Sequence, residues 1–229
     1  MKYLIFDCGG VLVWPRPGDW NIPYGAVEIL GERAGDIFSS RYVQAHRDSA
    51  RWLDESQLVP DVEAERKLRL EYIRSIDALM NWRLSPARQR RLADDFTDNP
   101  RRYGVFEDVD PWLKRWKGRY GLGMLSDAMP SILQFMARWG LLELFDAAVI
   151  STQVGATKPS PRMYAAILDA LGADPADCLF VDDRTDNLEG ALAAGMQAVQ
   201  MARPSYLPIA RWSGPVVHSF KELNGLIET

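Results

Sequence analysis

The sequence predicts an α/β protein: a parallel sheet with helices on both faces, and a helical domain inserted after the first strand. Beyond about residue 108, short apolar runs alternate with segments of helical periodicity. One more apolar run, residues 2–6, starts the chain and is separated from the rest by a long stretch of helical character. Polar residues follow several of the apolar runs. At 229 residues the chain is long enough for a core domain plus an insert.

The first strand is expected at residues 2–6, and the alternating part supplies the other elements of the sheet layer. Strands are predicted at 121–126, 146–151, 178–182 and 197–201, and helices at 108–118, 129–140, 160–171 and 186–195. Alternation of this kind is typical of right-handed strand-helix-strand units and hence of a parallel sheet. The tail from Arg203, with Pro204, Pro208 and Pro215, is expected to wrap the core and add an edge strand at 215–219.

The insert is expected to be entirely helical. Amphipathic helices are predicted at 36–53, 61–80 and 85–96, the last with a Ser85 cap and Pro86 in its first turn. Residues 14–23 are dense in Pro and Gly and predict a rigid, irregular connector. We therefore expect a core domain of residues 1–14 and 100–229, and a helical cap domain of residues 15–99.

Composition limits the partners. Apolar residues make up 47% of the chain, and a net charge of −4 gives no overall basic field, so we expect small-molecule ligands and no nucleic acid. The apolar run at the N-terminus is too short for a signal peptide, and no run approaches the roughly 18 residues that cross a bilayer. Cys8 and Cys178 lie at the edges of predicted strands, which favours reduced, buried thiols and a cytoplasmic location. A homodimer is compatible with the sequence.

Four polar signals stand where ligands of a parallel sheet bind. Asp7 follows the first strand, Ser126-Asp127 follows the strand 121–126, and Asp182-Asp183 follows a fully apolar run. Lys158 lies in a loop of small residues just before a predicted helix. Because the carboxyl ends of parallel strands meet at one edge of a sheet, these residues are expected to share one site.

Each signal has a structural alternative when taken alone. Asp7 could bond nearby backbone groups, Ser126 could cap the next helix, and Lys158 could be a solvated surface residue. Asp182 and Asp183 would repel one another unless a cation or a basic group lay between them, and Mg²⁺ is the natural occupant of such an oxygen-rich site. Together, the residues suit transfer of a phosphoryl group to a carboxylate nucleophile.

The pattern resembles the haloacid dehalogenase-like hydrolase superfamily over nearly the whole chain. The resemblance rests on four motifs in the right order, within residues 5–12, 125–127, 158–159 and 180–191. It implies a Rossmann-like, doubly wound core with an α-helical cap inserted after the first strand, the arrangement of the first cap class. It also implies a Mg²⁺-dependent phosphohydrolase acting on a small phosphorylated metabolite.

The resemblance assigns roles by position. Asp7 would attack phosphorus and form an aspartyl-phosphate, while Lys158 would offset the repulsion between that anion and its substrate. Phosphate-binding positions are Gly9, Ser126, Asp127 and Lys158. Metal positions are Asp7, the Gly9 carbonyl and Asp183, with Asp182 acting indirectly or through water. Asp186 and Asn187 either bond around the same loop or simply open the following helix.

The chain departs from the family at Gly9, where most of its phosphatases carry a second Asp that acts as general acid and base. Such help is worth roughly 100- to 10,000-fold in rate. His46 or Asp48 of the insert could substitute, or the substrate could carry a good leaving group, such as an anomeric sugar, acyl or aryl phosphate. Alternatively the protein binds phosphate and metal without catalysis. A 2-haloacid dehalogenase also lacks the second Asp, but the Asp182-Asp183 pair argues against that activity.

Specificity would lie in the insert, which reads the part of the substrate beyond the phosphate. Aromatic and basic side chains there could line a pocket for a sugar or another anion: Trp20, Trp52, Trp82, Arg41, Arg47 and Arg51. The alternative, which we favour, is that Trp at helical spacing packs in the core and that residues 88–91 form a solvated helix face.

Overall fold

The computed structural model describes residues 1–55, 57–204 and 212–228. Its contacts divide the chain into two compact units. The core unit comprises Met1–Trp14, Val105–Ala128 and Leu133–Thr229, and the helical unit comprises Pro15–Gly104 and Met129–Ile132. A two-stranded sheet lies where the chain enters and leaves the helical unit, because β2 (Val13–Pro15) pairs with β3 (Tyr103–Val105).

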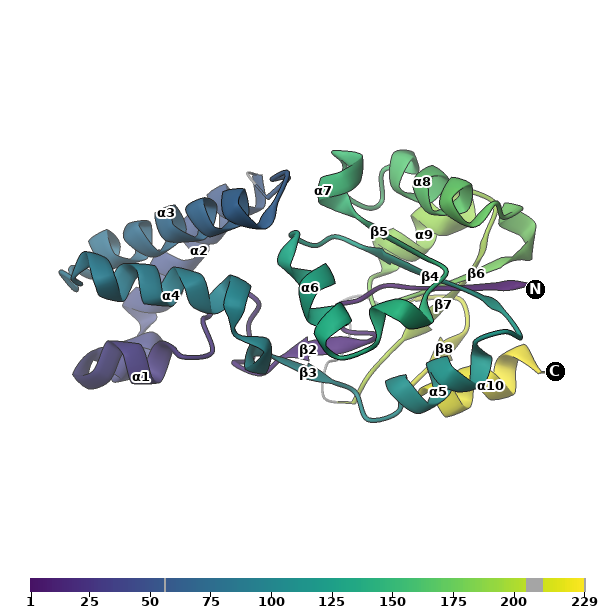
Figure 1. The fold of residues 1–229 in the computed structure, drawn as a ribbon, viewed down its shortest axis with the longest axis horizontal. Coiled ribbons are helices and arrows are strands. Elements are labelled where there is room, and N and C mark those ends of the chain that lie inside the picture. The colour runs from purple at the N-terminus through teal and green to yellow at the C-terminus, as the bar shows by residue number, and fades with distance from the viewer. Residues whose placement is uncertain (56, 205–211, 229) are drawn as a thin grey trace. The chain divides into compact units, whose positions relative to one another are not determined.

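The core unit contains a six-stranded parallel sheet, as the sequence predicts (Figure 1). Its strands are β1 (Tyr3–Phe6), β4 (Gly121–Ser126), β5 (Ala147–Ile150), β6 (Cys178–Asp182), β7 (Gln197–Met201) and β8 (Val216–Val217). The order is β5-β4-β1-β6-β7-β8, so the chain builds outward on one side of β1 and then returns to the other. This is a doubly wound arrangement, whose ligands bind where the direction reverses.

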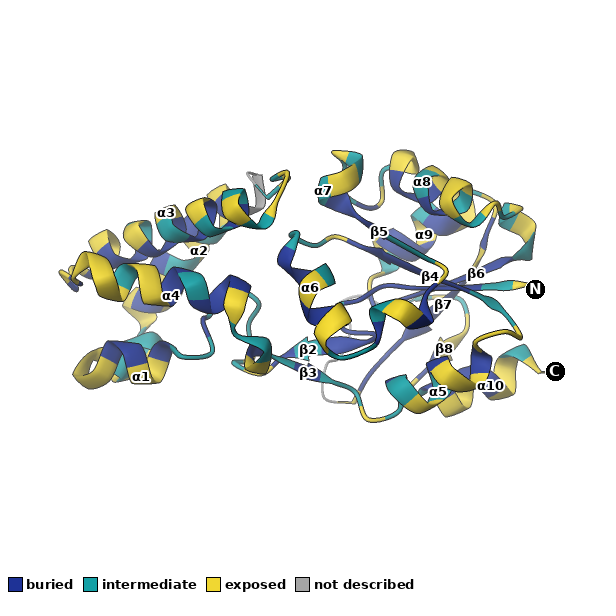
Figure 2. Cartoon of the chain, viewed as in Figure 1, coloured by how far each residue is buried: buried dark blue, intermediate teal, exposed yellow. Residues whose placement is uncertain are grey.

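Helices cover both faces of this sheet and explain why its strands are apolar throughout. The helices of the core unit are α5 (Val109–Trp116), α6 (Ser131–Arg138), α7 (Ser151–Val154), α8 (Pro161–Leu171), α9 (Thr185–Ala193) and α10 (Phe220–Ile227), although the first two residues of α6 cluster with the helical unit. On one face Tyr164 of α8 and Leu188 of α9 pack with Phe180 of β6. On the other, the Phe6 ring stacks 5.8 Å from the Trp116 ring of α5. Figure 2 shows the strands buried and the helices exposed on their outer sides.

The C-terminal tail differs from its prediction. The edge strand is shorter than expected, since β8 covers only Val216–Val217, parallel to β7. Helix α10 follows it and was not predicted, although Ser219 marks its start by accepting a hydrogen bond from the Glu222 backbone N–H (3.2 Å). Pro208 lies outside the described residues.

The helical unit has its own apolar core of residues buried between its helices. Its elements are α1 (Ala26–Leu30), the 3₁₀ segment η1 (Gly31–Phe38), α2 (Ser40–Glu55), α3 (Val62–Met80), α4 (Pro86–Asp98) and η2 (Pro100–Arg102). Asp61 caps α3 by accepting from the Ala64 N–H (2.8 Å), and Ser85 caps α4 with Pro86 in the first helical position. The predictions for α3 and α4 are thus correct to within two residues.

The predicted helix 36–53 is wrong at its start, and α1 was not predicted. Ser39 is extended and interrupts the helix between η1 and α2. Its hydroxyl oxygen accepts from the Tyr42 N–H (3.2 Å), so the cap stands three residues later than Asp36. The Asp36 carboxylate instead accepts a hydrogen bond from the Trp82 indole N–H at 2.6 Å.

Short 3₁₀ segments at Leu142–Leu144 and Pro175–Asp177 complete the core unit's elements. Cys8 and Cys178 are both free and buried, as expected. Among the residues that the structure describes, no helix has both the length and the apolarity needed to cross a membrane.

Candidate active site

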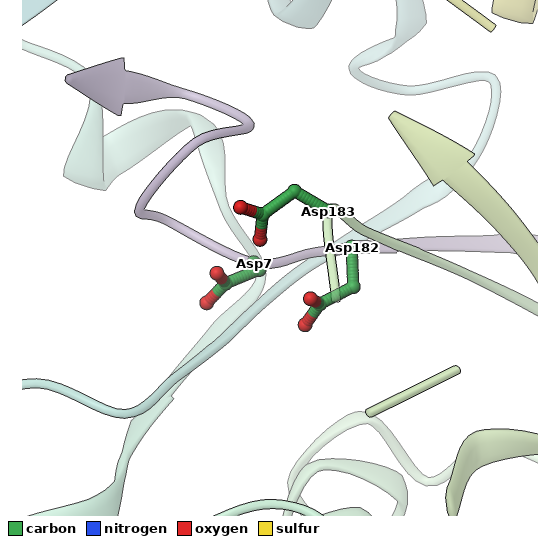
Figure 3. Close-up of side chains that lie close together, drawn as sticks. All are labelled: Asp7, Asp182 and Asp183. Atoms are coloured by element: carbon green, nitrogen blue, oxygen red, sulfur yellow. The ribbon is translucent and has the colours of Figure 1, made fainter. Parts of the chain in front are cut away.

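Three of the predicted site residues come together because their strands are neighbours. Strand β1 lies between β4 and β6, with Phe6 in register with Met124 and Val181. Asp7 therefore emerges beside Ser126, the last residue of β4, and Asp182, the last residue of β6. Figure 3 shows the carboxylates of Asp7, Asp182 and Asp183 grouped at this edge of the sheet.

A tight turn directly after β1 presents Asp7. The Asp7 N–H still donates to the Val181 carbonyl at 2.9 Å, which extends the parallel pairing to Asp7. The N–H groups of Leu12 and Val13 both donate back to the Cys8 carbonyl at 2.9 Å. Gly10 has a φ of 72°, which only glycine adopts without strain. The sharp turn leaves Asp7 7% exposed at the rim.

Lys158 lies between the carboxylates of Asp7 and Asp182. Its Nζ is 2.8 Å from Asp7 Oδ1 and 2.7 Å from Asp182 Oδ2, and its side chain is 1% exposed. It also donates to the Leu125 carbonyl at 3.2 Å. Burial by itself would lower the pKa of Lys158, but the Asp182 and Asp7 carboxylates outweigh burial and raise it above the ordinary value. The lysine is therefore a cation at neutral pH, in contact with the predicted nucleophile.

The three carboxylates can place one oxygen each within 4.8 Å of one another, and all three residues are buried. Burial and the charges of Asp7 and Asp182 raise the pKa of Asp183 to about 8. Burial raises the pKa of Asp182 to about 6, with Lys158 acting in the opposite direction. One lysine thus does not fully compensate the negative charge, and the donor set fits a hard divalent cation.

Asp182 is held by several donors of the protein. Its Oδ1 accepts from the Arg184 backbone N–H at 2.8 Å, and both its oxygens lie within 3.1 Å of Asn187 Nδ2. Together with Lys158 these donors orient the carboxylate toward the protein interior. The sequence left two roles open for Asn187: bonding near Asp182-Asp183, or opening the following helix. Asn187 lies on α9, and its side chain bonds to Asp182.

The segment that follows β4 is tied to the lysine loop. Asp127 Oδ1 accepts from the Lys158 backbone N–H at 2.9 Å, and Ser126 is buried. One residue later, the Ala128 N–H donates to the Ser151 hydroxyl oxygen at 3.1 Å, and that hydroxyl lies 3.3 Å from the Ala128 carbonyl. Of the predicted phosphate-binding residues, Asp127 and Lys158 are therefore joined by a hydrogen bond, and Ser126 is the residue directly before Asp127.

Sequence reasoning missed Ser151 and Gln200. Ser151 is buried at the start of α7 and fixes Ala128. Gln200 is buried in β7, and its Nε2 donates to the Asp183 carbonyl at 3.0 Å, holding the chain where it leaves β6. A signal for Gln200 was present, since a lone amide within the apolar run 198–201 requires a hydrogen-bonding partner.

Other predicted residues take structural roles or lie in the helical unit. The His46 ring nitrogens lie 2.7 Å from the Tyr72 hydroxyl and 3.2 Å from Asp19 Oδ2. Asp48 is exposed and accepts a hydrogen bond from Gln44 on its own helix. Asp186 pairs with Arg184 on the surface instead of joining the carboxylates.

The aromatic and basic residues proposed to line a substrate pocket have different surroundings in the structure. Trp82 is buried in the helical core, so packing, the alternative we favoured, is correct for it. Arg41 donates to the Leu79 carbonyl near the end of α3 (2.7 Å from Nη2). Trp52 is 39% exposed.

Comparison with known proteins identifies the family. Residues 1–195 match the model of the haloacid dehalogenase-like hydrolases. The phosphoserine phosphatase of Thermus thermophilus is 31% identical over 229 aligned positions, which cover 89% of each protein. Phosphatase MT3486 of Mycobacterium tuberculosis is 47% identical, but over 73 residues, 32% of each chain. The L-2-haloacid dehalogenase of Xanthobacter autotrophicus with covalently bound chloropropionic acid has a TM-score of 0.67 at 18% identity, covering 100% of this chain and 98% of that one.

The family match spans most of the chain, and one relative aligns along nearly all of it. The structural match confirms the doubly wound, Rossmann-like fold. On these grounds the protein is a hydrolase, and it belongs to the haloacid dehalogenase-like hydrolase family.

Proposed function

We propose that the protein is a Mg²⁺-dependent phosphohydrolase that acts on a small phosphorylated metabolite through an aspartyl-phosphate at Asp7. The observation that supports this most is the buried group in which Lys158 Nζ lies 2.8 Å from Asp7 Oδ1 while Asp183 lies close by. A carboxylate nucleophile must approach an anionic phosphate, and the adjacent lysine reduces the repulsion between them. Two relatives named as phosphatases support the same reaction class.

The proposed metal ligands are Asp7, Asp183 and the Gly9 carbonyl. Asp182 is left to a supporting role, because Lys158, Arg184 and Asn187 already bond its oxygens. When bound, Mg²⁺ would supply positive charge that offsets the developing charge on the transferring phosphoryl group.

In the proposed reaction an oxygen of Asp7 attacks phosphorus, the bond from phosphorus to the leaving oxygen breaks, and water later hydrolyses the acyl phosphate. Ser126 and the Lys158 ammonium would hold the non-bridging oxygens of the phosphate. Gly9 provides no acid for the leaving oxygen, so we propose substrates whose leaving group needs little protonation, such as anomeric sugar, acyl or aryl phosphates. The helical unit would act as the cap that reads the rest of the substrate.

The test is hydrolysis of p-nitrophenyl phosphate by the wild type and by Asp7→Asn, with Mg²⁺ and with EDTA. We expect metal-dependent turnover that the variant loses, because an amide is not a nucleophile of this kind. The matched control is Asp177→Asn, at the opposite end of β6, where Asp177 pairs with exposed Lys2. This control should retain full activity.

The alternatives give different results in the same assays. Bound metal and phosphate without turnover of any activated phosphate would indicate a non-catalytic binding protein. Release of chloride from 2-chloropropionate without metal would indicate a 2-haloacid dehalogenase, an activity for which Gly9 is no obstacle. His46→Gln and Asp48→Asn would test whether either residue replaces the missing acid, through loss of one limb of the pH profile. Gel filtration would show whether the protein is a homodimer.

A further inference from the structure

A carboxylate of the insert holds the segment that follows the predicted phosphate-binding residues. Glu65 lies in the first turn of α3 and is only 1% exposed. Its Oε2 accepts from the Ser131 backbone N–H at 2.8 Å, and its Oε1 accepts from the Ser131 hydroxyl at 2.8 Å. Ser131 is the first residue of α6. A buried carboxylate from another helix therefore caps α6, a position where the helix dipole favours negative charge.

The neighbours of Ser131 belong to the same unit as Glu65. Met129 packs against the apolar core of the helical unit, and Met129–Ile132 as a whole cluster with that unit. Residues Val105–Ala128 belong to the core unit, as do those from Leu133 onward. The chain thus passes into the helical unit and back within a few residues, directly after Ser126-Asp127.

On the core side the same segment is fixed just as closely. Asp127 accepts from the Lys158 N–H, and Ala128 is bonded to Ser151. Only the junction between Ala128 and Met129 separates these bonds from the part of the segment attached to the helical unit. Loss of the bonds to Ser131 would therefore release one end of a short segment whose other end carries Ser126 and Asp127.

We infer that Glu65 is a positioning residue for phosphate binding: by fixing Ser131 it makes the placement of Ser126 and Asp127 depend on the helical unit. This rests on the proposed phosphatase function. The physical basis is the cost of leaving the buried Ser131 N–H without an acceptor, which favours rearrangement of the segment over preservation of its geometry. The metal position would be unaffected, since Asp7 and Asp183 leave from other strands.

The experiment compares Glu65→Ala with Glu65→Gln and with Glu63→Ala. Glutamine retains an acceptor for the Ser131 N–H and so acts as the conservative rescue. Glu63 lies in the same turn of α3, but its side chain is 65% exposed and forms surface ion pairs with Arg66 and Lys67. It therefore controls for loss of a carboxylate from this helix.

We expect Glu65→Ala to raise KM for p-nitrophenyl phosphate and the inhibition constant of inorganic phosphate about tenfold, or ~1.4 kcal/mol. The Mg²⁺ activation constant should stay at the wild-type value. Hydrogen exchange of peptides that cover 126–133 should rise in Glu65→Ala alone. Glu65→Gln should bring both readouts most of the way back to the wild-type values, because its amide oxygen still accepts a hydrogen bond from the Ser131 N–H.

Unchanged phosphate inhibition or unchanged exchange in Glu65→Ala would overturn the inference, as would a parallel loss of Mg²⁺ affinity, which would indicate general loosening. If Glu65→Ala does not fold, Ser131→Ala carries the test, because it removes one hydrogen bond and leaves the backbone N–H in place. A wild type that neither hydrolyses nor binds phosphate would refute the proposed function, and the inference with it. A hydrolytic wild type with an unaltered variant would refute the inference alone.

Discussion

Replacing Lys158 with methionine should destabilise the metal-free protein by about 3 to 5 kcal/mol at pH 7.5, the range for removing one partner of a buried ion pair. Methionine retains an unbranched chain but removes the cation, whose Nζ lies 2.8 Å from Asp7 and 2.7 Å from Asp182. The lysine side chain is 1% exposed, so water cannot take over its role. The carboxylates that remain would be buried together without a compensating charge.

The loss should shrink as the pH falls. In the wild type, burial already raises the pKa of Asp182 to about 6 and that of Asp183 to about 8, and Lys158 opposes both shifts. Without Lys158, both pKa values should rise further above those of the unfolded chain. A carboxyl group whose pKa is raised by folding weakens the fold at higher pH, and this effect disappears once the group is protonated. The difference between variant and wild type should therefore be smaller at pH 5 than at pH 7.5.

Urea unfolding followed by circular dichroism at both pH values measures this difference. Lys114→Met is the matched control, because Lys114 is 61% exposed and pairs with Asp110 four residues earlier on α5. Such a surface pair contributes only about 0.3 to 0.5 kcal/mol. Added Mg²⁺ should recover part of the stability of Lys158→Met. A variant as stable as the wild type at pH 7.5, or a deficit that is equal at pH 5, would refute the reasoning.

Two further predictions concern the proposed metal site and the packing of α9 against Tyr164 of α8. Because the pKa of Asp183 is raised to about 8 by burial and by Asp7, Mg²⁺ binding at pH 7 should release protons and weaken from pH 8 to pH 6. Calorimetry in two buffers of different ionisation enthalpy measures this, and a pH-independent affinity would contradict it. Gly190→Ala should cost about 1 to 3 kcal/mol, because its Cβ would lie 2.4 Å from the Tyr164 hydroxyl oxygen, which donates to the Asn187 carbonyl. Gly225→Ala, in open space on α10, should instead stabilise by about 0.4 to 1 kcal/mol, so equal effects in thermal melts would disprove the packing argument.

Several features of the fold follow from local sequence alone. The apolar runs 121–126, 178–182 and 197–201 became strands with the predicted bounds, because strands buried on both faces carry a continuous apolar signal. Ser85-Pro86 marked the start of α4 correctly, since capping depends on residues adjacent in the chain. The order of the motifs also predicted which side chains would meet at the edge of the sheet, because parallel strands deliver their carboxyl ends together.

The elements that were missed depend on contacts between distant segments. β2 and β3 are short and have no pattern of their own, and each exists because the other pairs with it. Helix α10 is held by packing of Phe220 against Trp116, more than a hundred residues earlier in the chain. The start of α2 was misplaced because extended Ser39 interrupts the helix, and the Asp36 carboxylate accepts a hydrogen bond from Trp82, a distant residue.

The sequence by itself therefore determined the class of site: which residue types gather at the rim, and that two adjacent carboxylates need positive charge. Tertiary structure decided how that charge is distributed. It placed Lys158 between Asp7 and Asp182, surrounded Asp182 with donors, and brought Glu65 to the start of α6. The reason is physical: a side chain's type is local, but its partners, burial and pKa arise from segments that meet only in the folded chain.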